Sequence, residues 1–343
     1  MIEDIENKSF KQLLRETIKS KDTEEWIDIY FTRPIGLTIA LICRKLGIHP
    51  NSVTIFSIFV GVAGGCMFYF TDFWYNLLGV GLLMFANFLD SADGQLARLT
   101  GQKTAIGRFL DGFAENMWFL FIYLAIVFRL WNQFIPGLDD AWGVWIVVIA
   151  LLAMYCHSLQ CLLADYYRQI HLFFLKGEEG AELDNYQQQR ALYEALPKEA
   201  SFVDRFFYKN YASYCHRQEK RTPAFQKMMA TIREQYGSAD ALPQEIREEF
   251  LQGSRPLMPL TNILTFNVRA ICLYVTCLLN CPWVYLLFEI IVMNVLYVYM
   301  QQRHETLCVR IIEGVRSQGV RRQGDKESRR QGVKADEDKG RDI

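Results

Sequence analysis

The chain has 343 residues, of which 51% are hydrophobic and 22% are charged, and its formal charge at neutral pH is −1. So many large apolar residues exclude an intrinsically disordered chain. The near balance of 37 basic and 38 acidic residues argues against a nucleic-acid-binding protein. Nine cysteines in a chain of this length exclude a small disulfide scaffold.

Residues 1–50 form an N-terminal segment whose second half is apolar. Residues 26–46 read WIDIYFTRPIGLTIALICRKL and carry basic side chains at Arg33, Arg44 and Lys45. Because these charges would interrupt a membrane span, we expect an amphipathic helix that lies on the membrane surface. Pro50 then separates this helix from the next one.

Six long apolar stretches follow, and their distribution decides the class of the protein. A bilayer core about 30 Å thick needs about 20 helical residues. Ala141–Leu163, with 23 residues that carry no formal charge, meets this length alone. The other stretches continue into polar segments, as do helices that line a polar cavity at one end. Since a soluble helical bundle would not bury six such stretches, we predict an all-α polytopic membrane protein. Its six transmembrane helices are expected at 51–70, 75–98, 104–130, 141–175, 259–281 and 283–303.

Charge placement predicts the orientation of these helices. The short loops at 71–74, 132–140 and 281–282 contain neither Lys nor Arg, whereas nearly all basic residues lie on the other side. Cytoplasmic loops carry the excess of Lys and Arg, so we expect both termini in the cytoplasm. A bacterial inner membrane fits this asymmetry.

Two polar regions complete the chain. Residues 176–258 mix both charge signs and contain helical patterns at 184–197 and 222–236, which indicates a cytoplasmic helical insertion. Residues 304–343 repeat short charged units with Gln-Gly, and we expect this tail to be disordered. The predicted organisation is 1–50, 51–175 with the motif at 90–115, 176–258, 259–303 and 304–343.

Four carboxylates mark the most informative segment, residues 90–115. Asp90 and Asp93 are three residues apart at the end of one predicted helix, and Asp111 and Glu115 are four apart near the start of the next. Both spacings place a pair on one helix face. Four converging acids repel one another unless a cation binds them, and oxygen ligands favour Mg²⁺ or Mn²⁺.

Small residues and one arginine accompany the acids. Gly94, Ala97 and Gly107 allow a helix or a pyrophosphate to approach the backbone closely. Arg98 can pair with a carboxylate or a phosphate.

At these residues the chain resembles the CDP-alcohol phosphatidyltransferase family. The family signature is D-x2-D-G-x2-A-R, then eight or nine residues, then G-x3-D-x3-D. The matching residues are Asp90, Asp93, Gly94, Ala97, Arg98, Gly107 and Asp111, while Glu115 stands where the family has Asp. Pro50–Thr54 is also similar to the family's P-N-x-(V or I)-T segment.

The resemblance implies a metal-dependent phosphotransferase of phospholipid biosynthesis. It implies that a CDP-linked donor, such as CDP-diacylglycerol, transfers its phosphatidyl or phosphoalcohol group to a hydroxyl acceptor and releases CMP. The implied metal ligands are Asp90, Asp93, Asp111 and Glu115. The implied nucleotide site consists of Thr54, Gly94, Ala97, Arg98 and Gly107. Membrane lipids surround such enzymes, and a homodimer is compatible with the resemblance.

Glu115 leaves three interpretations open. Its additional methylene group moves the carboxylate by about 1 Å, which matters for a positioned group. We favour Glu115 as the general base in a site adapted to it. The alternatives are that Glu115 mainly binds metal, or that the protein is a catalytically weak or non-catalytic scaffold. A membrane cation transporter that uses the same acids is a further alternative.

Two arginines near the cytoplasmic ends of predicted helices are candidates for acceptor binding. Arg168 and Arg269 could together clamp a phosphorylated acceptor such as inositol phosphate. The alternative is that both are structural arginines that extend to the membrane interface. Glycerol phosphate, inositol, serine, or a diglyceride paired with CDP-choline or CDP-ethanolamine remain open as substrates.

Overall fold

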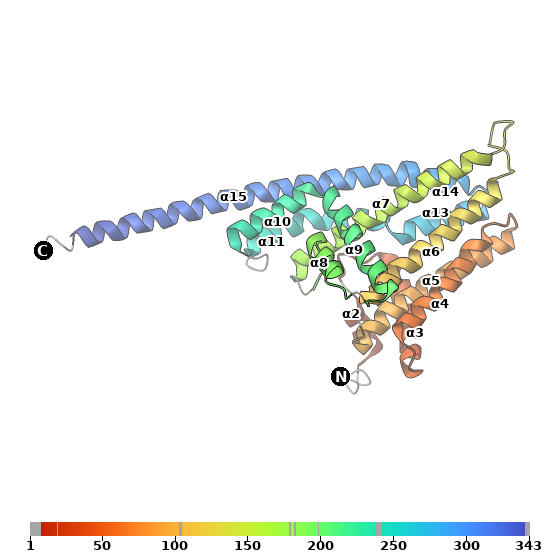
Figure 1. Ribbon diagram of the computed structural model, residues 1–343, viewed down its shortest axis with the longest axis horizontal. Helices are drawn as coiled ribbons and strands as arrows, with labels where there is room; N and C mark the ends of the chain where they lie inside the picture. The colour runs from red at the N-terminus through yellow and green to blue at the C-terminus, as the bar shows by residue number, and fades with distance from the viewer. Residues whose placement is uncertain are drawn as a thin grey trace. The chain divides into compact units, whose positions relative to one another are not determined.

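The computed structural model describes residues 8–18, 20–102, 105–177, 180–181, 183–197, 199–237 and 242–339 (Figure 1). Within these residues the chain is helical, with a single isolated β-bridge between Phe134 and Ala141. Six stretches are long and apolar enough to cross a membrane, which confirms the predicted fold class. They are Pro50–Met67, Phe73–Thr100, Leu110–Leu130, Gly143–Lys176, Gln244–Leu278 and Trp283–Ser317.

The helices follow one another along the chain with short connections. The first seven are α2 (Phe10–Thr17), the π-helical turn η1 (Asp28–Thr32), α3 (Arg33–Lys45), α4 (Pro50–Met67), α5 (Phe73–Thr100), α6 (Ala105–Leu130) and α7 (Gly143–Lys176). Next come α8 (Tyr186–Glu194), α9 (Phe202–Arg221), α10 (Pro223–Tyr236), α11 (Gln244–Ser254) and the 3-10 turn η3 (Arg255–Leu257). The last are α12 (Met258–Ile263), α13 (Phe266–Leu278), α14 (Trp283–Leu287), the π-helical turn η4 (Phe288–Val292) and α15 (Met293–Lys339).

The chain divides into two compact units. The first comprises Met1–Asp165, Lys198–Phe207 and Pro259–Tyr297. The second comprises Tyr166–Pro197, Tyr208–Met258 and Val298–Ile343. Both the predicted carboxylate segment and most of the apolar helices belong to the first unit.

Four helices of the first unit pack closely against one another. α4 packs against α5 and α6, and α3 packs against α5 (Figure 1). Small residues permit this approach: a Cβ atom added at Gly64 of α4 would lie 3.1 Å from the Gly79 carbonyl oxygen of α5. The Asp72 side chain caps the start of α5, and Gly101 ends it in the left-handed conformation at φ 71°.

A buried arginine ties together the helix ends farthest from the carboxylates. Arg129, near the end of α6, is 5% exposed. Its guanidinium donates to the Phe68 carbonyl at 3.0 Å and to Asn76 Oδ1 at 2.9 Å. It also donates to the Cys277 carbonyl at 3.3 Å and to Asn280 Oδ1 at 2.6 Å. One side chain therefore links α6 to the ends of α4, α5 and α13.

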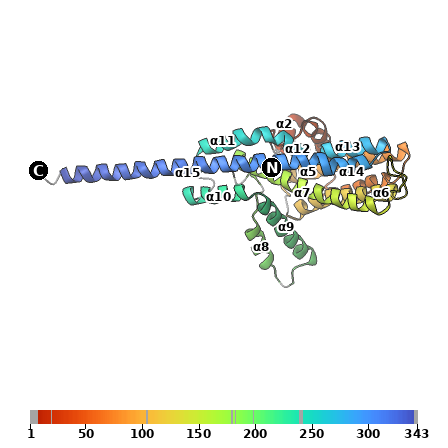
Figure 2. The same cartoon turned by 90° about the horizontal axis from the view of Figure 1, so that it is seen from above.

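The second unit contains α8, α10, α11 and most of α9 from the predicted insertion, together with the predicted tail. α15 runs between α10 and α11 (Figure 2). The Ala224 amide of α10 donates to Glu305 Oε2 at 2.7 Å, and Arg310 pairs with Glu249 of α11 at 3.5 Å. α8 and α10 lie within the predicted helical stretches 184–197 and 222–236, whereas the sequence pattern had not singled out α9 and α11.

The residues of the expected disordered tail continue a helix that begins before residue 304. α15 continues as a helix to Lys339. Its first turns beyond residue 303 bury apolar side chains at helical spacing, among them Leu307, Ile311 and Val315. These side chains explain the helix as far as residue 315, because a buried apolar stripe stabilises a helix that the surrounding charges conceal in the sequence.

The fifth predicted span is also not one continuous helix. α12 ends at Ile263 and α13 begins at Phe266, so the chain breaks at Leu264–Thr265. Near the N-terminus, α3 buries Leu37 and Ala40 while Ile42 and Leu46 stay 53% and 69% exposed. The placement of α3 on a membrane surface stays a prediction.

Candidate metal and nucleotide site

Three of the four predicted carboxylates converge where α5 and α6 meet. Oxygen atoms of Asp90, Asp93 and Asp111 all lie within 4.8 Å of one another. The first two come from α5 and the third from α6, and the helical spacing of three residues puts Asp90 and Asp93 on one face. Asp93 is buried, Asp90 is half-buried and Asp111 is exposed.

The chemistry of this group fits a divalent cation. Asp93 Oδ2 is buried and has no hydrogen-bond partner among the residues that the structure describes. A buried carboxylate oxygen of this kind is costly unless a cation or another ligand meets it. Three carboxylates without nitrogen or sulfur ligands suit Mg²⁺ or Mn²⁺ rather than zinc.

Glu115 lies beside the three carboxylates but is not part of the group. It is half-buried one helical turn after Asp111 on α6, and its charge acts on that of Asp90. The set of oxygens within 4.8 Å contains Asp90, Asp93 and Asp111 only. The role of Glu115 as general base or as metal ligand stays a prediction.

Arg98 presents unused hydrogen-bond donors next to the acids. A Cβ atom added at Gly94 would lie 3.5 Å from Arg98 Nη1, so the guanidinium lies over the Gly94 backbone. Arg98 Nε and Nη2 are buried and have no hydrogen-bond partner within the described part of the chain. The charges of Asp93 and Asp111 act on this guanidinium. Buried donors without partners are suited to an anionic ligand.

The other residues predicted for the nucleotide site lie on the same helices or on α4. Thr54 of α4 is 3% exposed, and its hydroxyl donates to the Pro50 carbonyl at 3.2 Å and lies next to the Asp93 carboxylate. Ala97 on α5 and Gly107 on α6 are half-buried. Their contact with a nucleotide stays a prediction.

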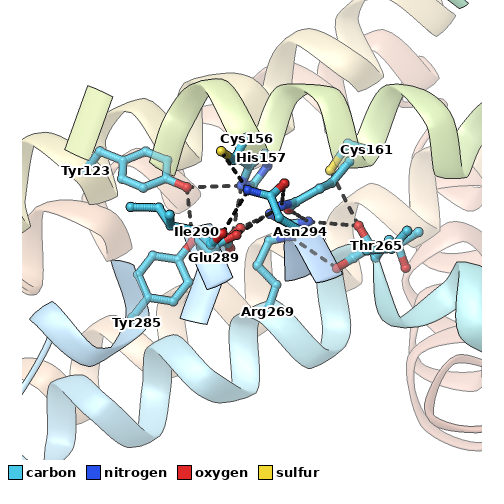
Figure 3. Close-up of polar contacts among 12 residues, drawn as sticks. Tyr123, Cys156, His157, Cys161, Thr265, Arg269, Tyr285, Glu289, Ile290 and Asn294 are labelled. Carbon is cyan, nitrogen blue, oxygen red and sulfur yellow. Dashed lines mark hydrogen bonds and ion pairs between the residues drawn. The ribbon is translucent and has the colours of Figure 1, made fainter. Parts of the chain in front are cut away.

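The two arginines predicted to bind the acceptor have different surroundings. Arg269 is fully buried and donates to Glu289 Oε2 at 2.6 Å, to the Leu264 carbonyl at 2.8 Å and to Gln160 Oε1 at 3.2 Å (Figure 3). Because its donors are taken up within the chain, the structure gives no support to an acceptor role for Arg269. Arg168, on α7, is half-buried and belongs to the second unit.

The partner of Arg269 could have been suspected from the sequence. Glu289 is the only charged residue between Ile271 and Met300. An isolated acid in an apolar stretch usually pairs with a base in a neighbouring helix. The pattern did not indicate which base this is, since Glu289 and Arg269 are 20 residues apart on separate helices.

Comparisons with known proteins agree with the signature. Residues 47–173 match the sequence profile of the CDP-alcohol phosphatidyltransferase family. The chain is also similar to archaetidylinositol phosphate synthase of Pyrococcus horikoshii, with 35% identity over 83 residues. The similar region covers 24% of this chain and 40% of that protein. The chain thus spans less than half the length of this curated relative.

Proposed function

Because residues 47–173 match the sequence profile of the CDP-alcohol phosphatidyltransferase family, we propose that this membrane protein transfers a phosphatidyl or phosphoalcohol group from a CDP-linked donor to a hydroxyl acceptor and releases CMP. The family match and the six apolar helices support an integral membrane protein that transfers phospholipid head groups. The observation that carries the proposal is the convergence of Asp90, Asp93 and Asp111 at the junction of α5 and α6.

The three aspartates are the proposed ligands of one or two Mg²⁺ or Mn²⁺ ions. Bound cations of this kind would neutralise the charge of the donor's pyrophosphate and of the CMP that leaves. The unpartnered oxygen of Asp93 is buried and therefore held in place by its surroundings. Thr54 of α4 helps to position the Asp93 side chain, because the Thr54 hydroxyl lies next to the Asp93 carboxylate.

Arg98 is the proposed contact for the pyrophosphate of the donor. Its two unpartnered nitrogen atoms can form a forked pair with phosphate oxygens. Gly94 beneath the guanidinium, together with Ala97 and Gly107, leaves room for the nucleotide to approach the backbone.

Glu115 is the proposed general base. Its carboxylate would accept the proton of the acceptor hydroxyl while the hydroxyl oxygen bonds to the phosphorus that carries the lipid or alcohol group. The bond from that phosphorus to the oxygen of CMP breaks in the same step, and CMP leaves. A base must reach the hydroxyl directly or through one water, and the half-buried position of Glu115 next to the aspartates suits this role.

The acceptor is a polar alcohol or alcohol phosphate. The relative from Pyrococcus horikoshii is named for an inositol phosphate lipid, which keeps inositol phosphate among the candidates. Arg168 is the remaining predicted contact for a phosphorylated acceptor. The uneven distribution of Lys and Arg supports a site that faces the cytoplasm, in a bacterial inner membrane.

CMP release by the purified protein tests the proposal. CDP-diacylglycerol would be offered with inositol, inositol phosphate, glycerol phosphate or serine, and the lipid product identified. We expect Glu115→Gln to slow CMP release by about 10²–10⁴-fold and Glu115→Asp to retain activity. Full activity of Glu115→Gln would refute its role as the base. No CMP release from any CDP-linked donor would favour the scaffold, and cation flux in proteoliposomes would favour the transporter.

A further inference from the structure

A fully buried ion pair joins α13 to the π-helical turn η4 in the first unit (Figure 3). Arg269 Nη1 donates to Glu289 Oε2 at 2.6 Å, and both side chains are 0% exposed. Such a pair is weak evidence for stability, because the cost of removing both charges from water offsets their attraction. π-helical turns such as Phe288–Val292 are frequent at functional positions. This ion pair is therefore expected to have a role other than stabilising the fold.

Arg269 holds the break between α12 and α13 in a fixed shape. Its Nη2 donates to the Leu264 carbonyl at 2.8 Å, and its Nε donates to the Thr265 carbonyl at 3.4 Å. The carbonyls at the end of a helix lack partners within that helix, so Arg269 supplies the missing donors. Gln160 of α7 secures the arrangement, since it accepts from Arg269 at 3.2 Å and donates to the Glu289 carbonyl at 3.0 Å.

The same break binds the N-terminal segment. The Thr265 hydroxyl lies 2.9 Å from Glu25 Oε1 and 2.6 Å from the Asn262 carbonyl oxygen, so its single proton is shared between these two acceptors. Asn267 Nδ2, two residues later, donates to Asp28 Oδ1 at 3.1 Å. Both acceptors are carboxylates that precede α3, and bonds to ionised groups are stronger than bonds between neutral ones. The break is thus the anchor for residues 24–33, which we call the N-terminal brace.

The other end of the N-terminal brace contacts the helix that carries the metal and nucleotide residues. Arg33 donates to Glu24 at 2.8 and 3.1 Å. Gln95 Nε2 of α5 donates to the Arg33 carbonyl at 3.0 Å. Gln95 is 0% exposed and lies between Asp93 and Arg98 in the chain. The charges of Glu24 and Arg33 also act on the Arg98 guanidinium.

We propose that Arg269 and Glu289 are positioning residues for the transfer reaction. They fix the break, the break anchors the N-terminal brace, and the brace sets the position of α5 and the charge around Arg98. The inference rests on the proposed function, because it assigns the effect to binding of the CDP-linked donor. Loss of the anchor should therefore raise the KM for the donor more than it lowers kcat.

Thr265 offers a matched pair of variants that leaves the ion pair in place. Thr265→Val removes the hydroxyl that Glu25 and the Asn262 carbonyl share, but keeps the shape of the side chain and the backbone carbonyl that Arg269 binds. Thr265→Ser keeps the hydroxyl. We expect Thr265→Val to raise the KM for CDP-diacylglycerol about 10-fold with kcat changed less than about 2-fold, and Thr265→Ser to behave as wild type.

Glu289→Gln tests the ion pair itself. It should raise the same KM, and the double variant Glu289→Gln/Thr265→Val should have a KM no higher than the worse single variant, because both act through one anchor. The proposal would be overturned if the increase in KM of the double variant equalled the product of the increases in the two single variants. So would a loss of kcat and thermal stability with KM unchanged, or equal defects in Thr265→Val and Thr265→Ser. The Thr265 pair keeps the test decisive if Glu289→Gln does not fold.

Amide hydrogen exchange separates this inference from the proposed function. Residues 20–33 should exchange faster in Thr265→Val than in wild type or Thr265→Ser, whether or not CMP is formed. Faster exchange together with no CMP release by wild type would overturn the proposed function and leave the anchor intact. Unchanged exchange in an enzyme that releases CMP normally would overturn the anchor.

Discussion

Gly61 of α4 lies against the indole ring of Trp118 of α6, and the packing of these two helices should depend on the missing side chain. A Cβ atom added at Gly61 would lie 2.2 Å from Trp118 Cδ1 and 2.3 Å from Trp118 Nε1. The ring cannot simply turn away, because it is 1% exposed and its Nε1 donates to the Ser57 carbonyl at 3.1 Å. Gly61→Ala must therefore displace the ring or separate α4 from α6.

The expected cost follows from three contributions to the free energy of unfolding. Overfilling a packed core costs about 1–3 kcal/mol. Loss of the hydrogen bond from Trp118 to Ser57 adds about 1 kcal/mol. The better helix propensity of alanine returns about 1 kcal/mol. We thus expect Gly61→Ala to lower the free energy of unfolding by about 1–3 kcal/mol.

Reversible unfolding in mixed detergent and SDS micelles, followed by circular dichroism, measures this change. Gly81→Ala in α5 is the matched control, because a Cβ atom there would have no heavy atom within 4 Å. The control should be as stable as wild type or slightly more stable. Trp118 is one turn from Glu115, so Gly61→Ala should also slow CMP release. A Gly61→Ala protein as stable as Gly81→Ala would refute the reasoning.

Three further predictions concern the acids and the far end of the helices. Asp93→Asn should weaken the apparent affinity for Mg²⁺ by 10-fold or more, seen as CMP release against Mg²⁺ concentration, and an unchanged dependence would contradict the metal site. Chelation by EDTA should stop CMP release and added Mg²⁺ or Mn²⁺ should restore it, with the helical circular dichroism signal constant throughout; activity that persists after chelation would argue for a different mechanism. Arg129→Met should lower the free energy of unfolding by about 2–4 kcal/mol through its four hydrogen bonds. It should leave the donor KM unchanged, because 18 helical residues, about 27 Å, separate Arg129 from Asp111; a raised KM would show that the two ends are coupled.

The features that the sequence predicts well are those set by neighbouring residues. Long apolar stretches predict the six helices, because a bilayer core requires about 20 helical residues, which Ala141–Leu163 supplies alone and the other stretches supply with their polar continuations. The spacings of Asp90 to Asp93 and of Asp111 to Glu115 put each pair on one helix face, and a short connection makes the helices neighbours. The meeting of Asp90, Asp93 and Asp111 therefore follows from local geometry. The finer position of Glu115, beside the group, depends on how α6 packs.

The features that the sequence conceals depend on distant partners. Nothing between Leu260 and Leu278 resembles a helix breaker, and the break at Leu264–Thr265 depends on Arg269, Glu289 and Gln160 from three different elements. Because these partners are distant in the chain, the sequence alone favours Arg269 as a contact for a substrate. Likewise, the polar composition after residue 303 resembles disorder, and only the buried side of α15 explains its helix as far as residue 315.

The hydrogen bonds of Arg129 also constrain the order in which the helices come together. Phe68 and Asn76 precede α6 in the chain, so half of the acceptors exist when α6 is synthesised. The Cys277 carbonyl and Asn280 appear only about 150 residues later. A guanidinium in a newly inserted membrane helix raises the free energy of insertion by about 2.5–3.5 kcal/mol until it finds hydrogen-bond partners. A nascent chain that ends before α13 should therefore hold its first three spans together less tightly than the finished protein does, and be the better target for membrane quality-control proteases.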